Sequence, residues 1–297
     1  MSIIDAHLHI FKYKEHWSEW AAKRWIQEMP DKYYWYTKKD LVPEDFNCEY
    51  QWTVEMMDKS GVDKAILLGN WQTPHEIKVP TSYIKEAVDT YPDRFFAFAA
   101  PDPLGGWDSV KELEDAYSHK GFYGIKLLPT YNYVPPTDKR IWPLYELTAA
   151  KNKRVIIHTG FGPISQNRLT WQEPYALEEL LVSFPDLKIS MGHTGYHRFM
   201  DAACLMSKNP NLYGDLAYWY FLPIDYVARS LVFAKSLGVL NRIMWGTDFP
   251  HIDPKADQAK LKRLVAYCKE NHIEPYITED DLKGLFGENA KKFLDID

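Results

Sequence analysis

The sequence predicts an α/β protein that folds as a single (β/α)8 TIM barrel over residues 1–297. Three observations predict this fold. Short runs of strand-forming residues alternate with amphipathic segments of helical length, which indicates a parallel sheet. Eight such runs can be counted, as a closed barrel requires. A chain of 297 residues is also long enough for such a barrel in one domain.

The predicted strands and helices follow one another regularly along the chain. The predicted strands are residues 3–11, 63–68, 94–99, 123–128, 154–158, 187–192, 211–215 and 242–248. The amphipathic stretches include residues 82–91, 109–119, 140–151, 174–184 and 255–271. Pro92 and Pro185 end two of them, because proline disfavours helical backbone in the residue before it. Residues 278–294 are expected to form a capped helix, a turn at Phe286 and Gly287, and a last helix.

Residues 12–52 are a long, aromatic-rich insertion after the first predicted strand. In a barrel, such a segment is expected to lie as a lid over the mouth, at the C-terminal ends of the strands. Its aromatic side chains include Trp17, Trp20, Trp25, Tyr33, Tyr34, Trp35, Tyr36 and Trp52. They could anchor the insertion to the barrel, line a pocket for a planar substrate, or bury the interface of a homodimer.

Charge, hydropathy and cysteine content exclude several classes of protein. The net charge is −6 and the pI is about 5.9, which provides no basic surface for nucleic acid. No apolar run approaches the roughly 18 residues of a membrane span, and the first residues do not resemble a signal peptide. Cys48, Cys204 and Cys268 are scattered, so neither a disulfide framework nor a Cys-x-x-Cys zinc site is expected. We therefore expect a cytoplasmic protein that acts on a small molecule.

Ionisable side chains gather at the C-terminal ends of the predicted strands, where barrel enzymes assemble their active sites. His7 and His9 are one residue apart in the first strand, so both should point to one face, about 6–7 Å apart. His158, His193 and Asp248 stand at later strand ends. Such a set of nitrogen and oxygen ligands suits Zn²⁺ first, then Mn²⁺, Fe²⁺ or Co²⁺.

Each of these residues also has an ordinary structural interpretation. A single histidine can belong to the core or the surface, Asp248 can be a turn residue, and Lys126 can extend its ammonium group to solvent. Their convergence on one end of a barrel favours chemistry over structure. A barrel that keeps the histidines only to bind another molecule is the non-enzymatic alternative.

Four motifs resemble those of the amidohydrolase superfamily. They are Asp5-Ala6-His7-Leu8-His9, His158-Thr159-Gly160, Gly192-His193-Thr194-Gly195 and Trp245-Gly246-Thr247-Asp248-Phe249-Pro250-His251. With Gly287-Glu288-Asn289-Ala290 and Phe293 near the end, their order resembles more narrowly the amidohydrolase-related (amidohydrolase 2) family of hydrolases and decarboxylases. The resemblance spans residues 3–294 and is specific for the superfamily, not for a substrate.

The resemblance implies a role for each motif residue. His7, His9 and His158 would hold the metal, and Asp248 would be a fourth ligand or the partner of a bound water. His193 would polarise the substrate or move a proton. Zinc can lower the pKa of its bound water to roughly 7, and Asp248 could pass the released proton to the leaving group.

Lys126 leaves the number of metal ions open. In superfamily members with two ions, a carboxylated lysine on the fourth strand bridges them, and Lys126 matches that position by strand count. Mononuclear relatives dispense with the bridge, and we expect one ion rather than two, with Lys126 in substrate contact or packing. His251, Arg168 and Arg198 are further candidates for substrate contact. Either arginine could clamp a carboxylate or simply be a solvated loop residue.

The motifs are compatible with two activities. The first is hydrolysis of a small ester, lactone or amide by metal-activated water. The alternative is non-oxidative decarboxylation of an aromatic or muconate-type acid, in which the metal chelates the carboxylate while an acid protonates the carbon. The aromatic insertion and the two arginines favour a planar, carboxylated substrate.

Overall fold

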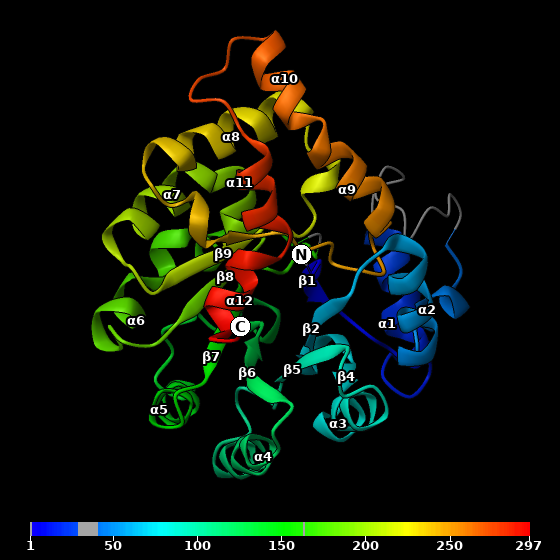
Figure 1. Ribbon diagram of the computed structural model, residues 1–297. Coiled ribbons are helices and arrows are strands. Elements are labelled where there is room, and N and C mark those ends of the chain that lie inside the picture. Colours follow the sequence, from blue (N-terminus) through cyan, green and yellow to red (C-terminus); the bar gives the residue numbers. More distant parts are fainter. Residues whose placement is uncertain (1, 29–40, 163) are drawn as a thin grey trace.

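The computed structural model describes residues 2–28, 41–162 and 164–297, and these contain one parallel sheet of eight strands (Figure 1). Its order is β1-β2-β5-β6-β7-β8-β9-β10. The strands are β1 (Ile4–Leu8), β2 (Lys64–Leu68), β5 (Phe95–Ala99), β6 (Phe122–Leu127), β7 (Arg154–His158), β8 (Ile189–Gly192), β9 (Leu212–Asp215) and β10 (Ile243–Met244). Each of them overlaps one predicted run.

The sheet closes between its first and last strands. The backbone N–H of Ala6 donates to the carbonyl of Trp245 at 2.8 Å, and that of Asp248 donates to the carbonyl of His7 at 2.9 Å. These bonds join β1 to the segment that follows β10. The predicted barrel is therefore confirmed, although its last strand is shorter than the predicted 242–248.

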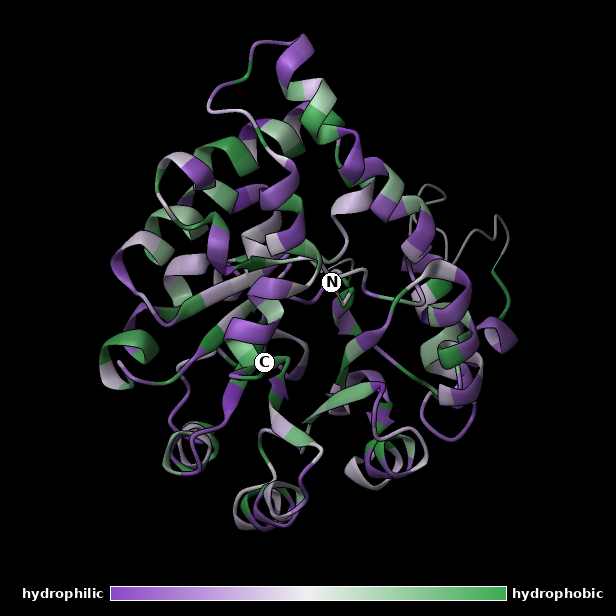
Figure 2. Ribbon diagram, in the orientation of Figure 1, coloured by the Kyte–Doolittle hydropathy of each residue, from purple (hydrophilic) through white to green (hydrophobic). Residues whose placement is uncertain are grey.

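Helices connect the strands on the outside of the barrel, as Figure 1 shows for α3, α4 and α5. The connecting helices are α2 (Tyr50–Ser60), α3 (Thr81–Thr90), α4 (Trp107–Ser118), α5 (Trp142–Ala150), α6 (Glu178–Ser183), α7 (Phe199–Lys208) and α8 (Ile224–Ser236). After β10 come α9 (Pro254–Lys262), α10 (Leu264–Glu270), α11 (Glu279–Lys283) and α12 (Asn289–Leu294). In Figure 2 the outer helices carry both hydrophilic and hydrophobic residues, as amphipathic helices do. None of the described helices is both long and apolar enough to cross a membrane.

Two hydrophobic clusters hold the barrel together. Alternate strand residues such as Ile66 and Phe98 fill its interior, where Phe293 of α12 packs against them. Intervening residues such as Leu67 pack outward against the helices. Arg154, at the start of β7, donates to the carbonyl of Phe293 at 3.1 Å. Helix α12 therefore closes the N-terminal end of the barrel and leaves the opposite end for the pocket.

The C-terminal segment corrects one expectation. Thr278 caps α11 as predicted, since its hydroxyl accepts from the N–H of Asp281 at 3.2 Å. The turn predicted at Phe286 and Gly287 is wrong, because both residues lie in a π-helical stretch that joins α11 directly to α12. A Cβ on Gly287 would collide with the carbonyl of Ser2. The glycine is needed for this close approach, not for a turn.

A short antiparallel hairpin, β3 (Asn70–Gln72) and β4 (Ile77–Val79), follows β2 and was not expected from the sequence. Helix α1 (Glu19–Glu28) lies in the insertion, and Trp17 just before it forms a backbone bridge with Ile77 of the hairpin. This part of the insertion therefore packs on the hairpin. The insertion's Tyr33, Tyr34, Trp35 and Tyr36 lie outside the described residues.

Candidate active site

A β-bulge in β1 sets the direction of His7 and His9. The pairing of β1 with β2 advances three residues on β1, from Asp5 to Leu8, against two residues on β2. The extra residue reverses the alternation of side chains. Ile4 therefore packs inside the barrel and Leu8 outside, while both histidines line a pocket at the C-terminal ends of the strands.

The pocket contains about 590 Å³ of space not filled by atoms, its open mouth included. Its ionisable lining residues are His7, His9, Lys126, His158, His193, Asp248 and His251. Its other lining residues are Phe11, Trp17, Trp25, Asn70, Gln72, Leu128, Tyr131, Phe161 and Tyr218. The structure therefore gathers polar groups against largely aromatic walls.

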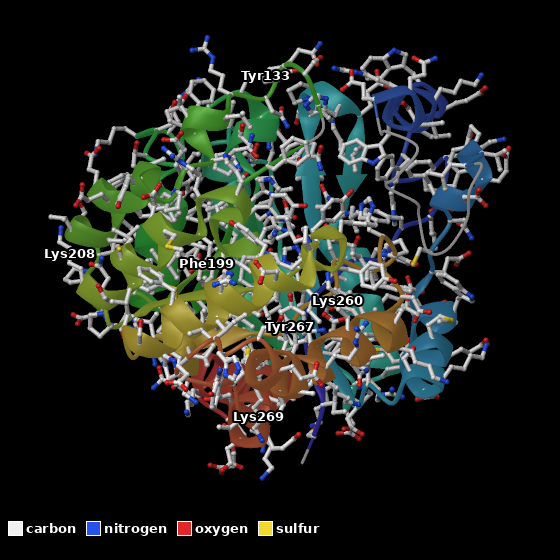
Figure 3. The ribbon with its side chains drawn as sticks, turned by 90° about the horizontal axis from the view of Figure 1, so that it is seen from above. Tyr133, Phe199, Lys208, Lys260, Tyr267 and Lys269 are labelled. Carbon is white, nitrogen blue, oxygen red and sulfur yellow. The ribbon has the colours of Figure 1, made fainter. Side chains whose placement is uncertain are left out.

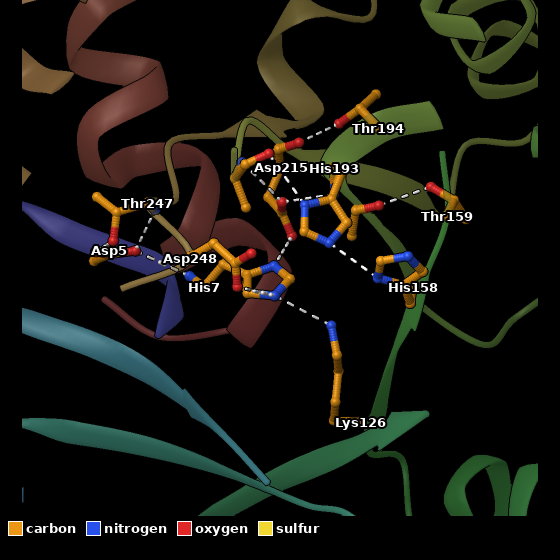
Figure 4. A network of polar contacts seen from close by, with 12 residues as sticks. Asp5, His7, Lys126, His158, Thr159, His193, Thr194, Asp215, Thr247 and Asp248 are labelled. Carbon is orange, nitrogen blue, oxygen red and sulfur yellow. Dashed lines mark hydrogen bonds and ion pairs between the residues drawn. The ribbon is translucent and has the colours of Figure 1, made fainter. Parts of the chain in front are cut away.

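Three donor atoms converge in this pocket. His7 Nε2 lies 3.5 Å from Asp248 Oδ1 (Figure 4). His9 Nε2 lies 3.4 Å from the same oxygen. Two ligand atoms bound at 2.0–2.2 Å to one tetrahedral ion are separated by roughly 3.3–3.6 Å, so this spacing suits a metal ion. All three side chains are buried. We call His7, His9 and Asp248 the donor group.

Hydrogen bonds on the far side of each ring leave Nε2 available. His7 Nδ1 donates to Asp215 Oδ2 at 2.9 Å, and His9 Nδ1 donates to the carbonyl of Leu68 at 3.1 Å. A proton on Nδ1 leaves the lone pair of Nε2 for a metal. Burial lowers the pKa of His7 well below its usual value, which keeps the ring neutral, as metal binding requires.

Asp248 complements the two neutral rings with a negative charge. Burial by itself would raise its pKa, but contacts with His9 and His7 outweigh burial and hold that pKa well below its ordinary value. The backbone of Asp248 has a φ of 61°, and that of His193 has a φ of 65°. Non-glycine residues rarely adopt this left-handed conformation, and such strain is concentrated at functional sites.

Glycines make room for His7. A Cβ on Gly246 would lie 2.8 Å from the Cβ of His7, and one on Gly192 would lie 3.2 Å from its Cε1. Both positions belong to the motifs around Asp248 and His193. The glycines of these motifs therefore serve close packing around the donor group.

Asp215, the last residue of β9, was missed by the sequence reasoning. Besides binding the ring of His7, its carboxylate accepts the backbone N–H groups of His193 at 2.8 Å and of Ala217 at 3.1 Å. Asp215, His7 and His193 form a second group of closely spaced donors. Because both oxygens of Asp215 are already used in these bonds, we assign it to orienting the histidines. Its place at the end of a predicted strand was the available signal.

Asp215→Asn is expected to lower metal affinity by about 10–100-fold, the usual effect of removing the partner of a histidine ligand. The amide can also favour the wrong tautomer of His7. Metal affinity is measured by titration in competition with a chelator. Asp257→Asn is the matched control, since Asp257 is a buried carboxylate that bonds Trp245 at 2.7 Å outside the pocket. Unchanged affinity in folded Asp215→Asn protein would contradict the orienting role.

His158 and His193 contact each other beside the donor group. His193 Nε2 lies 3.0 Å from His158 Nδ1, and His193 Nδ1 donates to the carbonyl of Ala217 at 3.1 Å. The second ring nitrogen of His158 faces the amide of Gln172 at 2.9 Å. Both ring nitrogens of His158 already have hydrogen-bond partners, so its role as a further metal ligand stays a prediction.

Lys126 enters the pocket from β6 and is only 1% exposed, so the alternative in which it extends to solvent is wrong. Its Nζ lies 3.2 Å from His7 Nε2. Burial lowers the pKa of Lys126 to about 8, although Asp215 and Asp248 favour its charged form. The position is compatible with substrate contact or with a bridging role, and both stay predictions.

Of the remaining candidates, His251 lines the pocket and the two arginines do not. Burial lowers the pKa of His251 to about 4. Arg168 is exposed and lies over the ring of Trp171 at 4.8 Å, and Arg198 is exposed and pairs with Asp201 at 3.3 Å. In the described residues, the expected arginine clamp is therefore not formed at the pocket.

Lys260 of α9, labelled in Figure 3, contacts the loop after β9, which carries the pocket residue Tyr218. The ammonium group of Lys260 donates to the carbonyls of Tyr220, at 2.6 Å, and of Leu222. A cation from outside the barrel thus fixes one wall of the pocket.

A parallel eight-stranded barrel with ionisable side chains converging at its C-terminal mouth has the architecture of a barrel enzyme. The chain belongs to the amidohydrolase family (Amidohydro_2), whose model matches residues 4–296. The predicted membership is therefore confirmed. A curated relative, the protein fluG of Emericella nidulans, is 31% identical over 108 residues. The match covers 34% of this chain but only 12% of that protein.

Solved structures share the fold at low identity. An uncharacterized TIM-barrel protein from Bordetella bronchiseptica has a TM-score of 0.75 at 18% identity, covering 99% of each chain. A second structure is 5-carboxyvanillate decarboxylase from Novosphingobium aromaticivorans, complexed with manganese and 4-hydroxy-3-methoxy-5-nitrobenzoic acid. Its TM-score is 0.66 at 16% sequence identity, and the match covers 99% of this chain and 96% of that one. A third is a probable 2-pyrone-4,6-dicarboxylic acid hydrolase from Acinetobacter baumannii with citric acid bound. Its TM-score is 0.65 at 15% sequence identity, and the match covers 100% of both chains. These likenesses confirm the barrel, and both a decarboxylase and a hydrolase share it.

Proposed function

We propose that this protein is a metal-dependent enzyme that removes carbon dioxide, without oxidation, from a small, planar carboxylic acid. The observation that carries the proposal is the donor group, in which both histidine Nε2 atoms lie 3.4–3.5 Å from Asp248 Oδ1 in a pocket with aromatic walls. The described part of the insertion supplies Trp17 and Trp25 to those walls, which supports its role as a lid over the barrel mouth.

The donor group fits a single divalent ion. Two imidazole nitrogens and one carboxylate oxygen suit Zn²⁺ and Mn²⁺, and the manganese in a similar structure makes that ion an equal first candidate. A bound ion would draw electron density from the carboxylate and a neighbouring oxygen of the substrate. One ion suffices, because the other closely spaced oxygens, those of Asp215, are engaged with His7 and the backbone.

Decarboxylation ranks ahead of hydrolysis for two reasons. The walls of the pocket are largely aromatic, which suits a planar ring. Several similar structures are decarboxylases of aromatic acids, against one described as a hydrolase. This order reverses the one suggested by the motifs.

In this reaction, side chains of the protein must transfer the proton. As the C–C bond breaks and carbon dioxide leaves, the ring carbon must gain a proton. Asp248 is ionised and faces the pocket, so it can accept a proton from a substrate hydroxyl and return it at that carbon. Lys126 and His193 face the same space and can bind substrate oxygens. The aromatic walls exclude water from the charged groups.

Hydrolysis of an ester, lactone or amide is the second candidate. The observation that favours it is the ionised carboxylate of Asp248 within 3.5 Å of both histidine nitrogens, where it can accept a proton from water. The same carboxylate would then deliver that proton to the leaving group.

The two activities separate in a direct assay. Protein stripped with a chelator and reloaded with Mn²⁺ or Zn²⁺ is given hydroxybenzoic and muconate-type acids, and in parallel lactones and esters. We expect carbon dioxide release that falls at least about 100-fold without metal and returns on reloading. Hydrolysis without carbon dioxide release would select the second candidate. Full activity in metal-free protein would contradict both.

A further inference from the structure

One series of ring contacts leads from the donor group along the wall of the pocket. The ring centroid of His9 lies 5.9 Å from that of Phe11, which lies 5.2 Å from Trp17, which lies 5.5 Å from Trp25. All four residues line the pocket. Trp25 is therefore three ring contacts away from His9 of the donor group.

A second series ends at the same tryptophan. The ring of His193 lies 4.6 Å from that of His158, which lies 4.9 Å from Tyr131, which lies 6.4 Å from Trp25. These residues also line the pocket. Since both series meet there, Trp25 marks the end of the pocket that is remote from the donor group.

Gln72 lies near Trp25, because its strand partner Ile77 lines a small cavity together with Trp25. Each of the two residues has a buried polar atom without a hydrogen-bond partner among the described residues. These atoms are Nε1 of Trp25, on a side chain 8% exposed, and Oε1 of Gln72, on a side chain 2% exposed. The amide nitrogen of Gln72 donates to Asn70 Oδ1 at 2.8 Å, and Oε1 is left available. A buried donor and a buried acceptor without partners are costly, and both residues line the pocket.

The lack of a cationic side chain near Trp25 limits which substrate groups can bind there. Among the described lining residues, Lys126 is the one lysine or arginine, and it lies beside His7 at the opposite end. Arg24, the neighbour of Trp25 on α1, is paired with Glu28 at 2.9 Å and does not line the pocket. An anionic group near Trp25 would therefore be buried without a counter-charge, which is unfavourable.

The geometry points to a second binding subsite at Trp25 and Gln72, which recognises an uncharged substrate group that both accepts and donates a hydrogen bond. Trp25 Nε1 donates to this group and Gln72 Oε1 accepts from it. A hydroxyl or a primary amide has this chemistry. The inference rests on the proposed function and narrows the substrate to a planar acid with such a group remote from its carboxylate.

Three probes of one shape test the subsite by calorimetric titration of the manganese-loaded protein. They are 2-hydroxybenzoate, 2,4-dihydroxybenzoate and 2-hydroxybenzene-1,4-dicarboxylate, which place a hydrogen, a hydroxyl or a carboxylate opposite the metal-binding end. We expect the dihydroxy acid to bind about tenfold more tightly than 2-hydroxybenzoate, since it satisfies both buried groups. The dicarboxylate should bind more weakly than the dihydroxy acid.

Variants test the two residues through the ratio of affinities, because a general loss of packing weakens all probes alike. Trp25→Phe keeps a ring without the donor, and Gln72→Met keeps the length without the acceptor. Each is expected to reduce the preference for the hydroxyl to about twofold. Trp20→Phe is the matched control, because Trp20 lies on the same helix, is 49% exposed and does not line the pocket. It should keep the tenfold preference.

The outcomes separate this inference from the proposed function. Equal binding of the three probes, or a preference that survives in both variants, would overturn the subsite alone. Probes that bind with the expected preference but release no carbon dioxide would support the subsite and count against decarboxylation. If no probe binds the metal-loaded protein, both proposals are contradicted.

Discussion

His7→Ala is expected to lower the affinity for a divalent metal by more than about 100-fold and to abolish turnover. Even the partners of histidine ligands contribute about 10–100-fold to affinity, and His7 supplies a donor atom itself, 3.5 Å from Asp248 Oδ1. The substitution also leaves the buried carboxylate of Asp215 without its 2.9 Å bond. Metal per chain is measured by mass spectrometry after equilibrium dialysis against Mn²⁺ or Zn²⁺.

A second variant tests whether loss of the metal in His7→Ala is caused by misfolding. His9→Ala removes another donor atom, but the far side of that ring bonds only the carbonyl of Leu68. Circular dichroism should show that this variant is folded while its metal is lost. His197→Ala is the matched control, since His197 is exposed and does not line the pocket. Wild-type affinity in both His7→Ala and His9→Ala would remove the donor group as the metal site.

Asp248→Asn is expected to lower kcat by about 10²–10⁴-fold, the usual contribution of a general acid or base. The amide has nearly the shape of the carboxylate but can neither accept the proton nor return it. It also lacks the negative charge that faces His7 and His9. The measurement is kcat at saturating metal, with the metal content of the same sample determined alongside.

The control for this variant makes the same chemical change outside the pocket. Asp253 caps α9 by accepting the N–H of Lys255 at 2.9 Å, and asparagine is an equally good cap, so Asp253→Asn should keep wild-type kcat. Wild-type kcat in metal-saturated Asp248→Asn protein would leave Asp248 as a ligand only. Another group would then have to carry the proton.

Local patterns predicted the barrel because strands and helices are short-range structures. The run 154–158 is β7 without change, and the alternation of strand and helix required parallel pairing. The same reasoning placed His193, His251 and Lys126 in the pocket, since C-terminal strand ends meet at one mouth. It failed for Arg168 and Arg198, because a loop residue near a strand end can turn toward solvent.

The two subsite residues, Trp25 and Gln72, could not be predicted from the sequence for a different reason. Gln72 belongs to a hairpin inserted between β2 and α3, where no motif marks it. Trp25 was one aromatic residue among many in the insertion, and nothing in the sequence distinguished it from the exposed Trp20. Only packing against Tyr131 and Trp17 decides which ring faces the pocket.

By itself, the sequence determined the barrel, its family and most of the ionisable residues at its mouth, because these depend on local periodicity and on motifs. The tertiary structure decided which of their atoms meet. The bulge in β1 turns His7 and His9 inward, and it arises from pairing with β2. Asp215 orients His7 from 208 positions away. Such contacts depend on register and barrel closure, which bring distant residues together and which no local pattern specifies.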